Sequence, residues 1–525
     1  MQLVGSWTTT NKMQIIDSKA LLLKLRHPER VLNTIPKSKR LDDGQVLVYW
    51  DLEAAQVLKN LGVKNVPSPI EGRYKWPGLF KPFDHQRETA AFLTLHRRAF
   101  CFNDPGTGKT ASFAWAADYL LDKGYIKRVL VICPLSIMNS AWQADLFKTV
   151  MHRTVDVAHG SRDKRIKVIN SGAEFVIINF DGVETVLPEL KAGGFDLIII
   201  DEANAVKTAT TKRWKSINSL ITPETWLWMA TGTPASQSPI DAYGIARMLN
   251  PSSVPPHFYS FRDMVMYKVT QFKWAAKKNA AEIVNKVLQP AIRFTKDECL
   301  DLPELLYTTR EVSLTPQQAK YYKMLKDQFI MAAAGETVTS VNAATNLNKL
   351  LQVASGAVYS DDGNTVEFDI THRYNVLVEA IDESTHKVLV FVPFRHAIEV
   401  LRDRLRKDGY AVEVIHGGIS VTRRTEIFKD FQTQPEPRIL LIQPAAASHG
   451  VTLHAANTVV WWGPVTSNEI WHQANARVHR AGQKNPCLVV RLCGCNVERK
   501  LYDALDAKTE DMDTLLNLYR EELDV

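Results

Sequence analysis

The stretch NDPGTGKT, residues 103–110, follows the apolar run 99–102 and opens a helical stretch over residues 110–121. A strand, a glycine-rich loop and a helix in this order are the context of a phosphate-binding loop. Glycines let backbone amides approach phosphate oxygens, and the helix N-terminus adds partial positive charge. The strict pattern GxxxxGK[ST] has glycine in place of Asn103, so a chance glycine-rich turn is the alternative. The stretch predicts a phosphate loop between a strand and a helix.

Five residues of this loop are candidate ligands of ATP. Gly106, Thr107 and Gly108 would bring backbone amides to the phosphates. Lys109 would bind the β- and γ-phosphates, and the hydroxyl of Thr110 would hold Mg²⁺. The predicted cofactors are therefore ATP and Mg²⁺.

A pair of carboxylates supports this prediction. Asp201 and Glu202 directly follow the apolar run 197–200. They therefore emerge at the C-terminal edge of a predicted sheet, where ligands bind in such folds. Asp201 would reach Mg²⁺, and Glu202 would position or deprotonate the attacking water. An acidic strand end without function is the alternative.

Short apolar runs rich in Val and Ile alternate with helical stretches in two blocks of the sequence. Each run is too short for a buried helix, so the alternation predicts an α/β fold with two lobes, each a parallel sheet covered on both faces. The last strand but one ends in Trp461 and Trp462, which we expect in the core rather than stacked on bases. The strands are expected at residues 129–133, 175–178, 197–200, 226–230, 388–392, 412–415, 439–442, 458–462 and 488–492.

The sequence divides into four segments. Residues 1–74 hold a strand at 46–50 and a helix that is capped by Asp51 and ends at Gly62, which predicts a small α+β domain. Residues 75–249 form the ATP-binding lobe. Residues 250–375, with amphipathic stretches at 274–288 and 316–332, predict a helical insertion. Residues 376–525 form the second lobe with a C-terminal helix.

The composition limits the classes of partner. The chain has 525 residues with 64 Lys and Arg against 57 Asp and Glu, a formal net charge of +7. This mildly basic balance fits a nucleic-acid partner without demanding one. No apolar run approaches the roughly 20 residues that span a bilayer, and six scattered cysteines suit a reducing compartment. We predict a cytoplasmic protein without a membrane partner.

The run QANARVHRAGQ at residues 473–483 completes a series of motifs. Their order and spacing resemble those of superfamily 2 motor ATPases of the Snf2 (SWI2/SNF2) family, and the resemblance covers residues 75–525. Asn204 replaces the family's histidine. The other matching segments are PFDHQ (82–86), NDPGTGKT, CPLSIMNSAWQAD (133–145), INFDG (178–182), DEAN (201–204), ATGTP (230–234), FTKDECLDLPE (294–304), VLVFVPF (388–394), HGG (416–418) and SHGVTLHAANTVV (448–460).

The resemblance implies two RecA-like lobes of a compact bacterial or phage type. Gln86 would bind adenine, and Gly450 would contact the nucleotide. Arg477 and Arg480 lie three residues apart, so on a helix they would share a face. They would stabilise charge on the transferring phosphoryl group, a role worth roughly 10³–10⁵ in rate. Two solvated arginines on a surface helix are the alternative.

Polar loops at strand ends would hold nucleic acid. The candidate contacts are Ser136, Asn179, His416, Gly417 and Thr452, and for Ser136, Asn179 or Thr452 alone a structural turn is an equal alternative. Such groups position phosphates without reading bases. The expected partner is therefore duplex DNA with little sequence specificity.

The function that follows is an ATP-dependent double-stranded DNA translocase that remodels DNA structures or protein–DNA complexes. A strand-separating, branch-migrating or annealing helicase is one alternative. An ATP-gated DNA-binding switch is another. We also expect a monomer, a protein partner bound through residues 1–74, and a location in a bacterial or phage-infected cell rather than a nucleus.

Overall fold

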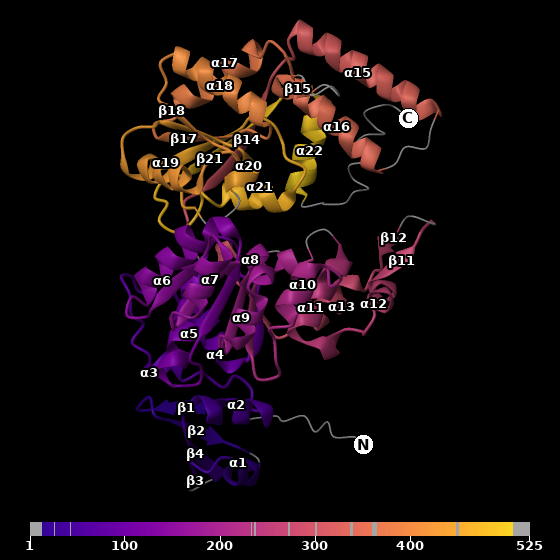
Figure 1. Ribbon diagram of the computed structural model, residues 1–525. Coiled ribbons are helices and arrows are strands. Elements are labelled where there is room, and N and C mark those ends of the chain that lie inside the picture. The colour runs from indigo at the N-terminus through magenta and orange to yellow at the C-terminus, as the bar shows by residue number, and fades with distance from the viewer. Residues whose placement is uncertain are drawn as a thin grey trace. The chain divides into compact units, whose positions relative to one another are not determined.

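The computed structural model describes residues 13–25, 27–41, 44–232, 234–235, 238–270, 274–299, 302–335, 340–359, 365–447 and 451–507. By its internal contacts the chain forms two compact units (Figure 1). The first comprises Met1–Ala235 and Pro239–Cys299, and the second comprises Ser236–Ser238 and Leu300–Val525. The predicted division into four segments stays a prediction.

The first unit is built on a sheet of seven strands that are all parallel. Three of its inner strands, β6, β8 and β10, are fully buried apolar runs, as a sheet covered on both faces requires. In sheet order the strands are β13 (Ala291–Ile292), β5 (Arg98–Cys101), β10 (Trp226–Ala230), β9 (Leu197–Asp201), β6 (Val129–Cys133), β8 (Phe175–Asn179) and β7 (Val155–Ala158).

Helices cover both faces of this sheet (Figure 1). Alternate residues of each strand enter two separate apolar clusters, one on each face. One face is packed by α4 (Asp84–Leu95), α5 (Lys109–Asp122) and α6 (Ala144–Thr149). The other is packed by α7 (Arg162–Ile169), α8 (Phe180–Thr185), α9 (Leu187–Ala192), α10 (Lys212–Asn218) and α11 (Ala242–Leu249).

A small antiparallel sheet with two helices lies N-terminal to this core, as the sequence predicts. Its apolar cluster includes Trp50 and the inward residues of strands and helix. The side chain of Asp51 caps α2 by accepting from the amide of Ala54 at 2.8 Å. In sheet order the strands are β1 (Met13–Ile16), β2 (Ala20–Lys24), β4 (Gln45–Tyr49) and β3 (Ser38–Arg40), packed by α1 (Pro28–Thr34) and α2 (Leu52–Asn60).

The end of the first unit differs from the expected helix over residues 274–288. Residues 274–276 instead form β12, because the ring of Trp274 lies under the guanidinium of Arg262 at 3.7 Å and the strand pairs with β11. The helix begins only at Ala280. The elements here are α12 (Phe258–Val265), β11 (Met266–Lys268), β12 (Trp274–Ala276), α13 (Ala280–Val287) and α14 (Lys296–Cys299), whereas α3 (Ile70–Arg73) lies directly before α4 in the sequence.

The second unit has a sheet of six parallel strands. Its edge strand β14 was not among the strands predicted from apolar runs. Its sequence is LLYTTRE, and its side chains are half-buried or exposed. In sheet order the strands are β14 (Leu305–Glu311), β21 (Cys487–Cys493), β20 (Ala456–Trp461), β17 (Lys387–Phe391), β19 (Ile439–Ile442) and β18 (Val412–Ile415).

Helices again pack both faces of this sheet. One face carries α17 (Thr371–Glu383) and α18 (Arg395–Lys407), and the other carries α19 (Val421–Thr433), α21 (Asn468–Asn475) and α22 (Asn496–Asp506). Beside them lie α15 (Pro316–Gly335), α16 (Ser340–Ser355), β15 (Ala357–Tyr359), β16 (Thr365–Glu367) and α20 (Pro444–Ala447). Trp461 and Trp462 are fully buried on opposite faces, which confirms their place in the core.

The predicted α/β fold with two parallel-sheet lobes and a small N-terminal domain is therefore confirmed. The described part of residues 250–375, the predicted helical insertion, consists mainly of helices together with short strands. In the part of the chain that the structure describes, no helix is both long and apolar enough to span a bilayer.

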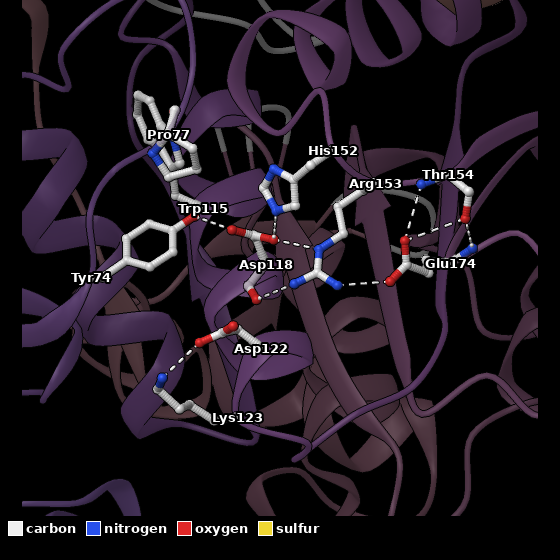
Figure 2. A network of polar contacts seen from close by, with 10 residues as sticks. All are labelled: Tyr74, Pro77, Trp115, Asp118, Asp122, Lys123, His152, Arg153, Thr154 and Glu174. Carbon is white, nitrogen blue, oxygen red and sulfur yellow. Dashed lines mark hydrogen bonds and ion pairs between the residues drawn. The ribbon is translucent and has the colours of Figure 1, made fainter.

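A buried carboxylate anchors the segment that leads from the small N-terminal sheet to α4 (Figure 2). Asp118 on α5, whose side chain is 3% exposed, accepts hydrogen bonds from the hydroxyl of Tyr74, from His152 and from Arg153, at 2.5, 2.9 and 2.5 Å. Arg153 also pairs with Glu174 at 2.7 Å. Burial raises the pKa of Tyr74 far above its usual value, so its hydroxyl remains a donor. The network joins α5 to segments on both sides of it in sequence.

We expect Asp118→Asn to destabilise the first unit by about 3 kcal/mol or more, because it removes one partner of a buried ion pair. Asp122→Asn is the matched control on the same helix. Asp122 is 55% exposed, and loss of such a pair costs less than about 1 kcal/mol. Urea unfolding followed by tryptophan fluorescence measures both. Equal shifts in the two midpoints would contradict a buried role for Asp118.

Candidate nucleotide-binding site

The loop of residues 103–108 adopts the backbone of a phosphate-binding loop. Gly106 and Gly108 have φ angles of +92° and +79°, in the left-handed region that side chains disfavour. A Cβ atom at Gly108 would also lie only 2.1 Å from the side-chain nitrogen of Gln86. The backbone conformation therefore favours glycine at position 108, and α5 begins immediately after it at Lys109.

Gln86 lies against this loop from the start of α4. Its Nε2 donates to the carbonyl of Thr107 at 3.1 Å, and its Oε1 accepts from the amide of Phe83 at 3.1 Å. The ring of His85 also donates to the Thr107 carbonyl, at 2.8 Å. The structure thus brings the predicted adenine residue and the predicted phosphate loop together.

Asn103, the departure from the strict pattern, has a structural role that the sequence does not reveal. It is 1% exposed, and its Nδ2 donates to the hydroxyl of Thr89 on α4 at 2.9 Å. Its Oδ1 accepts from the amide of Phe294 at 3.0 Å. The amide of Lys296 donates to Asp104 at 3.2 Å in the same region. The segment after β13 therefore holds the loop from its outer side.

Lys109 is directed back onto its own loop. Its Nζ donates to the carbonyls of Asn103 and Asp104, at 2.8 and 3.3 Å. Its positive charge also acts on Asp201. Burial raises the pKa of the Asp201 carboxyl, and the charge of Lys109 opposes part of that rise. The two predicted groups thus lie near enough to interact, although β10 separates their strands in the sheet.

Asp201 ends β9 with its carboxylate held at both oxygens. Oδ1 accepts from the amide of Glu202 at 3.0 Å, and Oδ2 accepts from the indole Nε1 of Trp142 at 2.8 Å. Glu202 follows with φ +60° and ψ 58°, a left-handed conformation that costs roughly 1–3 kcal/mol in a residue other than glycine. Such strain concentrates at functional sites. The carboxylate of Asp201 and the hydroxyl of Thr110 are hard oxygen donors, which suit Mg²⁺.

The two arginines of the second unit lie in a turn and not on a helix. The sequence predicts that Arg477 and Arg480 share a helical face, but α21 ends at Asn475. Beyond the helix, the side chain of Gln483 donates to the carbonyl of Val478 at 3.3 Å, and the carbonyl of Arg477 accepts from the amide of Leu453 at 2.9 Å. Arg480 donates to the carbonyl of Val451 at 3.2 Å. The predicted ligand Gly450 lies outside the described residues.

The predicted nucleic-acid contacts fall at strand ends in both units. In the first, Ser136 is half-buried, and Asn179 is 8% exposed with its Oδ1 accepting from Arg165 at 3.0 Å. In the second, Gly417 is exposed and Thr452 is half-buried.

His416 is the buried member of this group. It is 5% exposed, and its Nδ1 accepts from the amide of Gly418 at 3.1 Å. Burial and then the charge of Arg395 lower its pKa. The bond of His416 lies within its own loop, and the bond of Asn179 joins that residue to Arg165 on α7.

Comparison with known proteins defines the family. Residues 85–355, more than half of the chain, match the SNF2-related domain. The chain belongs to the SNF2-related family. Residues 372–482 match the helicase conserved C-terminal domain. The Snf2 resemblance and the prediction of an ATP-hydrolysing core of helicase superfamily 2 are thereby confirmed.

Relatives of this SNF2-related chain include bacterial and animal proteins. An uncharacterised ATP-dependent helicase of Mycoplasma genitalium is 25% identical over 445 residues, 80% of this chain and 41% of its own length. Mouse chromodomain-helicase-DNA-binding protein 1-like is 23% identical over 488 residues, 86% of this chain and 53% of its own. The chain thus spans about half the length of these relatives.

Among solved structures, the SWI2/SNF2 ATPase core of Sulfolobus solfataricus in complex with double-stranded DNA aligns with a TM-score of 0.41 and 22% identity. The alignment covers 83% of this SNF2-related chain and 92% of that one.

Proposed function

We propose that this protein is an ATP-dependent translocase on double-stranded DNA that remodels DNA structures or protein–DNA complexes. The observation that carries the proposal is the pairing of a glycine-dependent phosphate loop with Asp201, held at both carboxylate oxygens, at one edge of the first sheet. A DNA-bound ATPase core and chromodomain helicases among the similar proteins favour a nucleic-acid partner.

Within this proposal each residue has one task. Gln86 contacts adenine, and the amides of residues 106–108 bind the phosphates together with Lys109. Thr110 and Asp201 would hold Mg²⁺, which neutralises charge on the β- and γ-phosphates when it is bound. Glu202 orients the attacking water. Arg477 and Arg480 would supply positive charge from the second unit to the transferring phosphoryl group, and Gly450 would contact the nucleotide.

The sheet edges of the two units offer polar groups for the DNA backbone. Ser136, Gly417 and Thr452 are accessible and suit phosphate contacts. We expect affinity to fall with salt by a log–log slope of about −0.9 per neutralised phosphate and to depend little on sequence. A monomeric state, a protein partner at residues 1–74 and a bacterial or phage-infected cytoplasm stay predictions.

The decisive experiment measures ATP turnover without DNA, with single-stranded DNA and with duplex DNA, alongside displacement of a third strand from a triplex. We expect strong stimulation by duplex DNA together with displacement. Stimulation only by single strands, with unwinding of a duplex, would instead establish the helicase alternative. Nucleotide-dependent DNA affinity with turnover that no DNA accelerates would establish the switch.

A further inference from the structure

The segment that follows β6 has an unusual backbone. A 3₁₀ turn over Leu135–Ile137 leads into a π-helical turn over Met138–Gln143, and only then does α6 begin. π-Helical turns are rare and frequently occur at functional sites. This turn carries Trp142.

Trp142 lies between the two halves of the ATP site in the first unit. It is 1% exposed, and its ring packs edge-to-face on Phe113 of α5, with 6.4 Å between ring centres. Its indole N–H donates to Oδ2 of Asp201 at 2.8 Å. Since the amide of Glu202 holds the other oxygen, the indole fixes the rotation of the carboxylate. The sequence reveals no such role, because the partner lies 59 residues away.

The opposite side of the same segment faces solvent. Leu135 is 44% exposed, and Asn139 and Ser140 are exposed. The hydroxyl of Ser140 donates to the carbonyl of Ser136 at 2.8 Å, which ties the outer turn together. One short segment thus carries a polar outer surface and, on its inner surface, a direct bond to Asp201.

We propose that Trp142 is a positioning residue that transmits the binding of a DNA backbone on the outer surface of residues 135–143 to the carboxylate of Asp201. The proposal rests on the function proposed above. A phosphate that contacts Ser136, Asn139 or Ser140 shifts the π-helical turn. The indole moves with the turn and resets the orientation in which Asp201 meets Mg²⁺. Loss of a partner that orients a metal ligand lowers metal affinity roughly 10–100-fold.

Trp142→Phe tests the proposal, because it removes the N–H and keeps an aromatic ring. Trp228→Phe is the matched control. Trp228 is also fully buried, also packs on Phe113, at 6.0 Å, and also donates its N–H, but to the carbonyl of His96. Substituting 3-benzothienylalanine for Trp142, which exchanges the N–H for sulfur in a ring of the same shape, serves if the phenylalanine variant does not fold.

Two quantities are measured on the full chain. The first is the Mg²⁺ concentration needed for tight binding of a fluorescent ADP analogue, which requires no turnover. The second is the ratio of ATP turnover with and without duplex DNA. We expect Trp142→Phe to raise the Mg²⁺ requirement roughly 10–100-fold and to reduce the ratio towards one, with ADP binding in EDTA and duplex affinity unchanged. Trp228→Phe should leave both quantities near those of the wild type.

An Mg²⁺ requirement that is the same in the two variants would overturn the positioning role. A raised requirement with a normal ratio would overturn the transmission from DNA. Failure of the proposed function is distinguishable, since a wild-type protein that no DNA stimulates would show it before any variant is made, while the Mg²⁺ measurement would still test positioning.

Discussion

Lys109→Ala should lower ATP turnover by at least about 10²–10³-fold, the loss that follows removal of a single group that stabilises developing charge. The ammonium now bonds the carbonyls of Asn103 and Asp104, so it is preset beside the phosphate positions of the loop. Release of phosphate, measured with and without duplex DNA, gives the size of the effect.

Lys123→Ala is the control for this change. Lys123 lies just beyond the end of α5, its side chain is 41% exposed, and it pairs with Asp122 at 2.6 Å in solvent. This substitution also removes one positive charge near α5, but at a distance from the phosphate loop. ATP turnover should therefore remain normal. Turnover in Lys109→Ala close to that of the control would show that the phosphate site has been misassigned.

Arg477→Ala should slow ATP hydrolysis roughly 10³–10⁵-fold while nucleotide binding persists, as expected for an arginine that acts on the transferring phosphoryl group. Binding of the fluorescent ADP analogue and single-turnover hydrolysis separate the two effects. Arg477→Lys should recover only part of the rate, because an ammonium cannot make the planar two-point contact of a guanidinium.

Arg477 is only 7% exposed, so its variants need a check on folding. Arg499→Ala in the same unit provides the comparison, since Arg499 is 57% exposed and pairs with Glu311 on the surface. Urea midpoints of the variants should agree with that of the wild type before rates are compared. Hydrolysis that remains near normal in a folded Arg477→Ala protein would contradict the catalytic assignment.

The central strands were predictable because burial on both faces selects continuous apolar runs. Residues 129–133, 226–230, 412–415 and 439–442 form strands with the predicted bounds. Edge strands β13 and β14 were not predictable in this way. The first has two residues, and the second carries charged and polar side chains on an edge that needs little apolar surface.

The phosphate loop was predictable from its glycines, but its supports were not. Asn103 and Asp201 each accept one hydrogen bond from a residue distant in sequence, Phe294 and Trp142 respectively, and neither donor carries a local pattern. The predicted helix through Arg477 failed for a related reason. The backbone carbonyls of Arg477 and Val478 bond the amide of Leu453 and the side chain of Gln483, and neither partner could be inferred from the local pattern.

The hydrogen bond between Asn103 and Phe294 spans 191 residues of chain. During synthesis on the ribosome, the phosphate loop is therefore made well before the segment that supports it. At roughly 5–20 residues per second, on the order of 10–40 s pass between synthesis of the loop and synthesis of the segment after β13 that secures it. During this interval a nascent chain has every residue of the loop but not the segment that holds it in place. A fragment that stops before residue 290 would lack this supporting segment permanently. A fragment designed as a stable first lobe should therefore extend beyond α14.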